Sequence, residues 1–194
     1  MLIESFIITF SIQLIVTEIR VENVVAYTNV GYIELEEISS KLGGAEFDIN
    51  QFPAILFRPS DLKSAVLIFG NGKVICTGPK SVKEAKKVID NVIKKLKKAG
   101  IEIEDYEIEI ENIVASYELG VPINLSAILG LGDVEYKPSQ FPGAIWRFEN
   151  VTALIFVSGK IVLTDTNEME NIEKGVETIT KLLSSLGYTI PSTS

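Results

Sequence analysis

The stretch that decides the fold lies at residues 64–78 and reads "SAVLIFGNGKVICTG". Two short apolar runs flank a Gly-Asn-Gly turn, a pattern that predicts a β-hairpin. Side chains alternate between the two faces of a strand, so one face takes Val66, Ile68, Val74 and Cys76. The other face takes Leu67, Phe69, Ile75 and Thr77. Both faces are apolar, so the hairpin needs a second contact surface in addition to a core.

The hairpin and the segments before it occur twice in the chain. "VENVVA" (21–26) returns as "IENIVA" (110–115), "QFPAILFR" (51–58) as "QFPGAIWR" (140–147), and "LIFGNGKVICT" (67–77) as "LIFVSGKIVLT" (154–164). Between 19–58 and 108–147, 13 of 40 positions are identical, and between 67–77 and 154–164, 6 of 11 are. The offset falls from 89 to 87 after Arg147, where the second copy lacks two residues. The chain is therefore an internal duplication, which predicts a pseudo-twofold molecule.

Each copy shows the same order of predicted elements. A strand (about 18–29 and 106–118) precedes a short amphipathic helix (about 34–42 and 123–131), three or four short strands (about 45–77 and 134–164) and a long helix. Ser81 with Glu84 predicts a capping box at the start of the first long helix, and Gly100 lies where it should end. Seven lysines between Lys83 and Lys98 cover its outer face. We therefore divide the chain into an apolar N-terminal extension (1–17), a first repeat (18–100), a second repeat (101–188) and a tail (189–194).

The composition excludes several classes of function. The 194 residues are 46% hydrophobic and 23% charged, with no histidine and one cysteine, Cys76. This excludes a disulfide framework, Cys/His zinc sites and histidine-based catalysis, and it fits a reducing cytosol. Neither a metal nor a cofactor is expected, and no enzyme activity. The localisation expected is cytoplasmic, or nuclear in a eukaryotic cell.

The net charge of −8 is spread unevenly along the chain. Residues 1–100 carry 13 basic and 11 acidic side chains, whereas residues 101–194 carry 5 and 15. The apolar N-terminal extension lacks the basic start and the small-residue cleavage site of a signal peptide, and its uninterrupted apolar part is too short to span a bilayer. We expect it to form an extra strand or a docked arm, and we expect no membrane partner.

One face of the predicted sheet is left uncovered, because each copy supplies several strands but only two helices. Alternation places the following residues on it: Asn23, Val25, Leu67, Phe69, Ile75 and Thr77, with Asn112, Val114, Leu154, Phe156, Val162 and Thr164 from the second copy. An exposed apolar face of this size indicates an interaction site. Duplex DNA is a pseudo-twofold ligand that suits a pseudo-twofold protein. The alternative is that this face is buried in a homodimer of the free protein or under the N-terminal arm.

These motifs resemble the TATA-box-binding protein family, most closely its archaeal members. "ENVVA"/"ENIVA", "QFPAILFR"/"QFPGAIWR" and "LIFGNGKVICTG"/"LIFVSGKIVLT" carry the resemblance, which extends from about residue 18 to 188. It implies an α+β fold, a pseudo-twofold saddle in which one curved antiparallel sheet of ten strands carries four helices on its convex face. In this family the concave face straddles the minor groove of DNA and bends it.

The resemblance also implies a role for each residue that matches a family motif. Phenylalanine pairs that wedge between base steps correspond to Phe52 with Phe69 and Phe141 with Phe156. Base and groove contacts correspond to Asn23, Val25, Leu67, Ile75, Thr77, Asn112, Val114, Leu154, Val162 and Thr164. Phosphate contacts correspond to Arg58, Lys73, Lys80, Arg147 and Lys160. The loop that engages transcription factor B corresponds to Tyr136, Lys137, Pro138, Ser139 and Gln140.

The second copy departs from the family pattern at two places. Asp165 and Asn167 replace the glycine and lysine of "TGPK", and "YKPS" replaces the acidic "YEPE", which puts Lys137 and Ser139 in the partner loop. The resemblance implies a general initiation factor that binds an A·T-rich promoter box, recruits transcription factor B and, through it, RNA polymerase. The alternative is a divergent paralog whose sheet or loops bind mainly protein.

Overall fold

The computed structural model describes residues 18–59 and 63–190, and the extension expected at 1–17 lies outside these ranges. One antiparallel sheet of ten strands runs through both repeats in the order β2-β3-β4-β5-β1-β6-β10-β9-β8-β7. The first repeat supplies β1 (Arg20–Asn29), β2 (Ala45–Glu46), β3 (Ala54–Phe57), β4 (Ala65–Phe69) and β5 (Lys73–Thr77). The second supplies β6 (Glu109–Glu118), β7 (Val134–Glu135), β8 (Gly143–Arg147), β9 (Thr152–Phe156) and β10 (Lys160–Thr164). Four short strands thus follow the long first strand in each copy.

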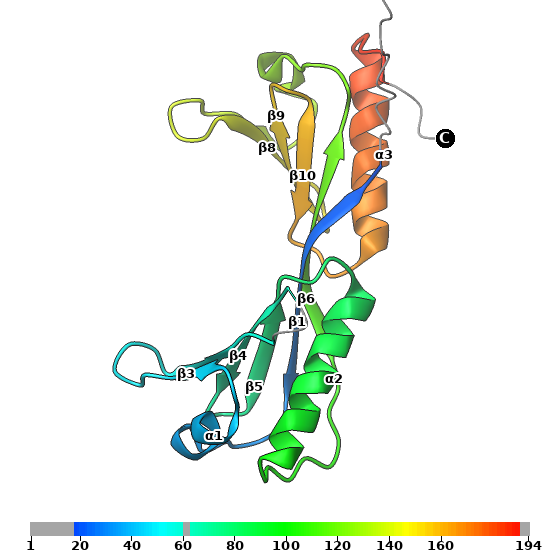
Figure 1. The fold of residues 1–194 in the computed structure, drawn as a ribbon. Coiled ribbons are helices and arrows are strands. Elements are labelled where there is room, and N and C mark those ends of the chain that lie inside the picture. The colour runs from blue at the N-terminus through cyan, green and yellow to red at the C-terminus, as the bar shows by residue number, and fades with distance from the viewer. Residues whose placement is uncertain (1–17, 60–62, 191–194) are drawn as a thin grey trace, which may run out of the picture.

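The two repeats join through their first strands at the centre of the sheet. β1 and β6 run antiparallel with Val24 opposite Ile113, and the register shifts between Val21 and Asn23 and again between Val25 and Ala26. Such β-bulges increase the local twist of a strand pair. Figure 1 shows the result as an arch, with the long helices along one side and the loops of both repeats projecting from the other. The fold is the predicted α+β saddle.

Each repeat has its own apolar core between the sheet and a long helix. In the first repeat, α2 (Val82–Lys98) covers Val66, Ile68, Val74 and Cys76, all with 0% exposure. In the second, α3 (Met169–Ser185) covers the equivalent strands. The predicted core face of the hairpin is therefore confirmed, and its other face lies on the concave side of the arch.

Among the residues that the structure describes, the expected count of four helices is wrong by one. The first repeat forms α1 (Leu35–Lys41), but the second forms only a 3-10 turn, η1 (Leu125–Ile128). Leu129 already adopts an extended conformation, with φ −62° and ψ 131°, and Gly130 follows with φ 91°. Glycine favours this left-handed conformation and not a further helical turn. The predicted helix at 123–131 therefore stops after one turn.

Only one of the two hydrogen bonds of the predicted capping box forms at the start of α2. Ser81 Oγ accepts a hydrogen bond from the Glu84 N–H at 3.1 Å, as expected. The Glu84 carboxylate, however, accepts from the N–H of Lys80 at 2.8 Å and not from that of Ser81. The start of α2 is thereby tied to the "TGPK" segment that leads from the concave face.

Candidate nucleic-acid interface

The uncovered residues line the concave face in matched pairs from the two repeats. Val25 lies opposite Asn112, Asn23 opposite Val114, and Leu67 opposite Ile75, with Leu154 opposite Val162 in the second copy. All ten groove-lining residues predicted from the sequence are partly exposed, while their sequence neighbours in the strands are mostly buried. The ten side chains carry no charge, so the face is apolar with amide and hydroxyl groups at fixed places.

Two asparagines are held in the same way in each copy. Asn23 Oδ1 accepts the N–H of Gly78 at 2.6 Å, and Asn23 Nδ2 donates to Thr77 Oγ1 at 3.0 Å. In the second copy Asn112 Oδ1 accepts the N–H of Asp165 at 3.1 Å, and Asn112 Nδ2 donates to Thr164 Oγ1 at 3.1 Å. The backbone N–H groups fix which end of each amide is oxygen. Each Nδ2 carries two hydrogens, so one remains available to an acceptor on the concave face.

A pair of phenylalanine rings lies toward each end of the concave face. The ring centroids of Phe52 and Phe69 are 6.0 Å apart, and those of Phe141 and Phe156 are 5.8 Å apart, both with edge-to-face geometry. Phe52 keeps 46% exposure. Contiguous apolar surface of this kind indicates an interaction site, and the two pairs are positioned to contact a ligand of twofold shape.

The two pairs sit on different supports. Ala54 lies opposite Phe69 in the strand register, whereas Gly143 occupies the equivalent place opposite Phe156. A Cβ on Gly143 would lie 2.9 Å from Phe141 Cε1 and 3.1 Å from the backbone oxygen of Ile155. The glycine therefore lets the second pair approach the sheet.

The five predicted phosphate-binding side chains differ in how free they are. Arg58 contacts Glu46 at 2.8 Å, and Arg147 contacts Glu135 at 3.4 Å, so each copy forms the same exposed pair at the sheet edge. Lys80 Nζ donates to the backbone oxygen of Glu22 and lies 3.2 Å from its carboxylate. Exposed pairs of this kind contribute at most about 1 kcal/mol, so they can open to phosphate at little cost.

Lys73 and Lys160 hold equivalent places but have different surroundings. Lys73 Nζ lies 3.8 Å from Glu111 Oε1 and 4.5 Å from the ring centroid of Tyr27. Lys160 is exposed and forms no ion pair within the described ranges. The two copies therefore do not present equal charge at this position.

The predicted partner loop lies between β7 and β8. Tyr136 is partly buried, and the residues from Lys137 to Gln140 are exposed. Lys137 pairs with Glu135, which also contacts Arg147, and these two cations lower the pKa of the Glu135 carboxyl. The lysine that distinguishes "YKPS" is thus balanced by a neighbouring carboxylate.

Four further residues on the concave face escaped the sequence prediction. Leu56 lies opposite Leu67, and Ile145 lies opposite Leu154, so both extend the apolar lining. Tyr27 donates to Glu109 at 2.7 Å, and Ser116 donates to Glu22 at 2.7 Å. Continuing the alternation of "AILF", "GAIW" and the two long strands would have found all four.

Other kinds of site find no support in the part of the chain that the structure describes. There, no group of three or more His, Cys, Asp or Glu residues is placed to hold a metal ion. Over the same residues, no helix has the length and apolar character needed to cross a membrane.

The sheet and its matched side chains define a two-repeat saddle protein of the TATA-binding class. The family model described as "Transcription factor TFIID (or TATA-binding protein, TBP)" matches residues 18–99 and 107–186. The chain belongs to this family.

Two relatives and a solved structure agree with this assignment. The TATA-box-binding protein of Archaeoglobus fulgidus is 45% identical over 177 residues, covering 88% of this chain and 97% of that protein. The TATA-box-binding protein of Picrophilus torridus is also 45% identical over 177 residues, covering 88% and 96%. The solved structure of Methanococcus jannaschii TBP superposes with a TM-score of 0.78 at 42% identity, covering 87% of this chain and 99% of that one.

Proposed function

We propose that this chain is a transcription initiation factor that binds a TATA-like, A·T-rich promoter element through its concave face. The family membership supports a TATA-box-binding transcription factor. The observation that carries the proposal is the matched pair of asparagines, Asn23 and Asn112. Both are anchored through Oδ1 and present Nδ2 on an uncharged apolar face.

The chemistry of this face suits the minor groove of A·T-rich DNA. There A·T and T·A pairs both present acceptors, adenine N3 and thymine O2, whereas a G·C pair adds the amino donor of guanine. The two amide nitrogens can donate to these acceptors. The apolar lining of Val25, Leu67, Val114 and Leu154 offers no partner to the guanine amino group, so burying that group would cost free energy.

The phenylalanine pairs supply the second part of the mechanism. Apolar wedges that enter between base steps unstack them and kink the duplex toward the major groove, most easily at flexible pyrimidine–purine steps. We infer that Phe52 with Phe69, and Phe141 with Phe156, act as these wedges at the two ends of the site. Arg58, Arg147, Lys80, Lys160 and Lys73 would contact the phosphates.

Two protein partners complete the proposal. The loop of Tyr136, Lys137, Pro138, Ser139 and Gln140 projects from the second repeat and is exposed from Lys137 onward. We infer that it engages transcription factor B, which in turn brings RNA polymerase. Lys137 replaces an acidic residue of the family pattern and pairs with Glu135, so we infer that this contact is either weaker than in other family members or matched by a partner of altered charge.

A second candidate is a family member whose sheet binds mainly protein. The observation that favours it is a cluster formed by Lys73, Glu111, Tyr27 and Glu109. DNA binding needs a cation at this place that is free to contact a phosphate. Asp165, in the position equivalent to Gly78, adds a further negative charge.

Gel-shift titration of A·T-rich and G·C-rich duplexes separates the two candidates, with Phe156→Ala as the test variant. The first candidate predicts preference for the A·T-rich duplex and a loss of bending for Phe156→Ala while the circular dichroism spectrum is retained. Equal, weak binding to both duplexes, with no effect of Phe156→Ala, would support the protein-binding candidate instead.

A further inference from the structure

The concave face ends along two rims, which the pseudo-twofold axis exchanges. The first rim comprises the start of β1, the ends of β5 and β6 and the start of β10. The second rim comprises the end of β1, the starts of β5 and β6 and the end of β10. The register places Arg20 opposite Ser116 and Lys160 opposite Glu118 on the first rim. On the second rim, Tyr27 lies opposite Glu109 and Asn29 opposite Lys73.

The two rims differ in charge although the repeats are homologous. The first rim carries four basic side chains, Arg20, Lys63, Lys80 and Lys160, and two acidic ones, Glu22 and Glu118. At the equivalent positions the second rim carries one basic side chain, Lys73, and four acidic ones, Glu109, Glu111, Asp165 and Glu168. The difference arises where Arg20 is replaced by Glu109, Lys63 by Asn150, Gly78 by Asp165, Lys80 by Asn167, Ser81 by Glu168 and Glu118 by Asn29.

The single lysine of the second rim is already engaged. Glu111 lies 3.8 Å from Lys73 Nζ, the Tyr27 ring lies beneath it, and Tyr27 donates to Glu109. The first rim places its glutamate differently. Glu22 accepts from Ser116 and from Lys80, contacts that lower the pKa of its carboxyl, and Lys160 is left without an ion pair within the described ranges.

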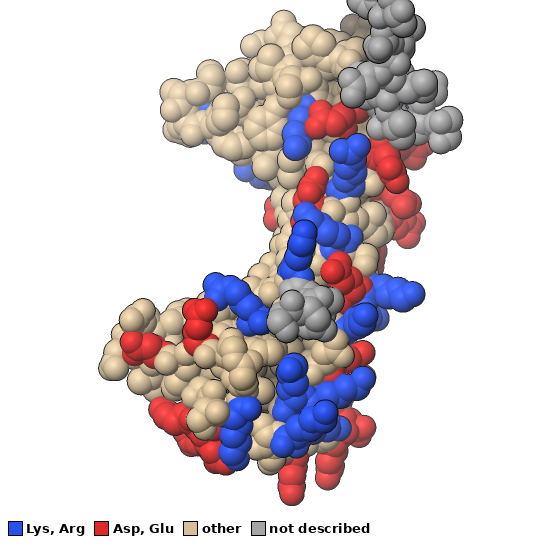
Figure 2. Space-filling model, in the orientation of Figure 1, with Lys and Arg blue, Asp and Glu red and all other residues tan. Residues whose placement is uncertain are grey.

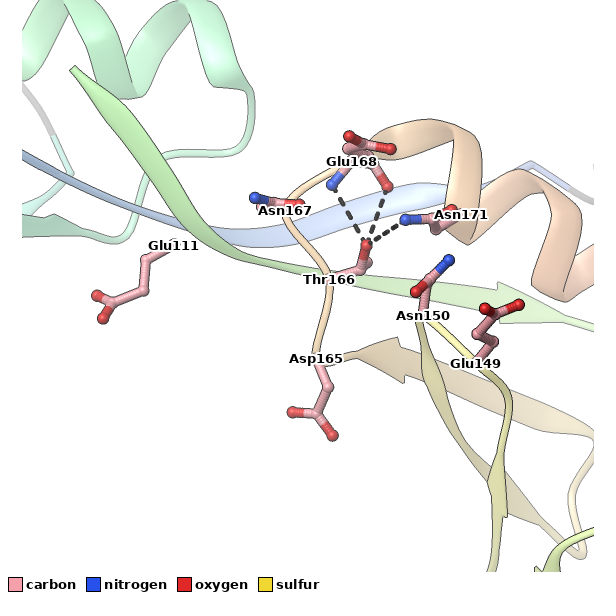
Figure 3. Close-up of a pocket in the computed structure, with 8 residues that line it drawn as sticks. All are labelled: Glu111, Glu149, Asn150, Asp165, Thr166, Asn167, Glu168 and Asn171. Carbon is pink, nitrogen blue, oxygen red and sulfur yellow. Dashed lines mark hydrogen bonds between the residues drawn. The ribbon is translucent and has the colours of Figure 1, made fainter. Parts of the chain in front are cut away.

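The end of the second rim is a hollow lined by carboxylates and amides. Glu111, Glu149, Asp165 and Glu168 line it together with Asn150 and Asn167. Figure 3 shows the carboxylates of Asp165 and Glu111 directed away from the ribbon and clear of the Thr166 hydrogen-bond cluster. Asp165 has φ 63° and the equivalent Gly78 has φ 108°, so both turns need a positive φ at this position. In the second copy the turn also carries a negative charge.

We propose that the two rims hold the two DNA strands unequally: the first rim binds phosphates, and the second contributes little because its carboxylates oppose them. This inference rests on the proposed DNA binding. Each phosphate that is neutralised releases counterions and adds about 0.9 to the slope of log affinity against log salt for duplex DNA. Lys73, with the carboxylate of Glu111 beside it, should therefore add less than Lys160, which forms no ion pair within the described ranges.

The matched lysines of the two copies give the direct test. For binding of an A·T-rich duplex over a range of salt, Lys160→Ala should lower the slope by about one, and Lys73→Ala by clearly less. Lys97→Ala, which removes an exposed charge from α2 on the opposite face, controls for net charge.

A gain-of-binding variant tests the opposing charge. Asp165→Asn keeps a residue that tolerates the left-handed conformation and should raise affinity about two- to fivefold at low salt, an effect that fades as salt screens it. If the wild-type chain binds the duplex but Lys73→Ala and Lys160→Ala lower the slope equally, the inference about the rims is overturned while DNA binding stands. If the wild-type chain binds no duplex, both proposals are overturned.

Discussion

Asn23 and Asn112 divide their amide groups between the fold and the concave face. Their Oδ1 atoms satisfy the backbone N–H groups of Gly78 and of Asp165, at the points where β5 and β10 lead into the long helices. An unpaired backbone N–H that is shielded from water costs about 1–3 kcal/mol. The same side chains present Nδ2 on the concave face, so one residue couples the turn to the ligand surface.

Asn23→Asp separates these two roles. The carboxylate keeps an oxygen for the Gly78 N–H, and the Thr77 hydroxyl can turn to donate to it, so we expect a free energy of unfolding close to that of the wild type. The donor is lost and a negative charge enters the face, so duplex affinity should fall at least tenfold, about 1.4 kcal/mol. Urea unfolding and fluorescence anisotropy measure the two effects. Asn23→Ala is the comparison, because it should lower both stability and affinity.

Cys76 behaves as a core side chain and not as a reactive thiol. It has 0% exposure, and burial raises the pKa of its thiol to about 12. Because the unfolded thiol ionises near 9.0, ionisation favours the unfolded chain as the pH rises between these two values, and stability falls there. At pH 8 an aromatic disulfide reagent should modify the native protein far more slowly than the protein in denaturant. Equal rates in both states would contradict the burial of this residue.

At the scale of elements, the same hairpin serves as core on one face and ligand surface on the other. In β4 and β5 every second side chain packs under α2, and the side chains between them line the concave face with Phe69 at its end. The ring pairs are supported by the strands beneath them, and Gly143 allows the closer approach of the second pair.

Gly143→Ala tests this support. The added Cβ would meet the Phe141 ring and the backbone oxygen of Ile155, and forcing an extra methyl group into a packed site typically costs about 1–3 kcal/mol. We expect the second ring pair to shift, with less bending at that end of the duplex, as measured by energy transfer between dyes at its ends. Ala54→Gly in the first copy is the matched control, because it removes a Cβ and should leave the bend. An unchanged bend in Gly143→Ala would contradict a role for this ring pair.

The sequence predicted most strands and the side chains on each face of the sheet, because these follow from the alternation of residues along a strand and from the internal repeat. The buried set of the hairpin, the asparagine positions and Phe69 with Phe156 follow from period-two patterns that occur twice, whereas Phe52 and Phe141 follow only from the family resemblance. The prediction of a second short helix was wrong because residues 123–131 share little sequence with residues 34–42. The repeat therefore gave no sign that Leu129 and Gly130 adopt non-helical conformations. The pairing of Arg58 with Glu46, and of Lys73 with Tyr27 and Glu111, could not be seen because these contacts join different strands across the sheet.

At the scale of the whole molecule, the two repeats share one continuous sheet but keep separate cores and opposite helix charges. Figure 2 shows basic side chains gathered over the lower right, where Figure 1 places α2. The exposed side of α3 instead carries Glu170, Glu173 and Glu177, two of which pair with Lys174 and Lys181, so its net charge is slightly negative. The duplication therefore preserves the shape of the concave face while the charge around it has diverged.

The central claim is that the concave face recognises A·T-rich DNA through the minor groove. The most direct measurement compares the affinity for an A·T-rich duplex, the same duplex with every A·T pair replaced by G·C, and a third with inosine in place of each guanine. Inosine–cytosine pairs lack the guanine amino group and so resemble A·T in the minor groove, while their major groove resembles G·C. The account predicts that the inosine duplex binds like the A·T duplex and much more tightly than the G·C duplex. Binding of the inosine duplex as weak as that of the G·C duplex would contradict it.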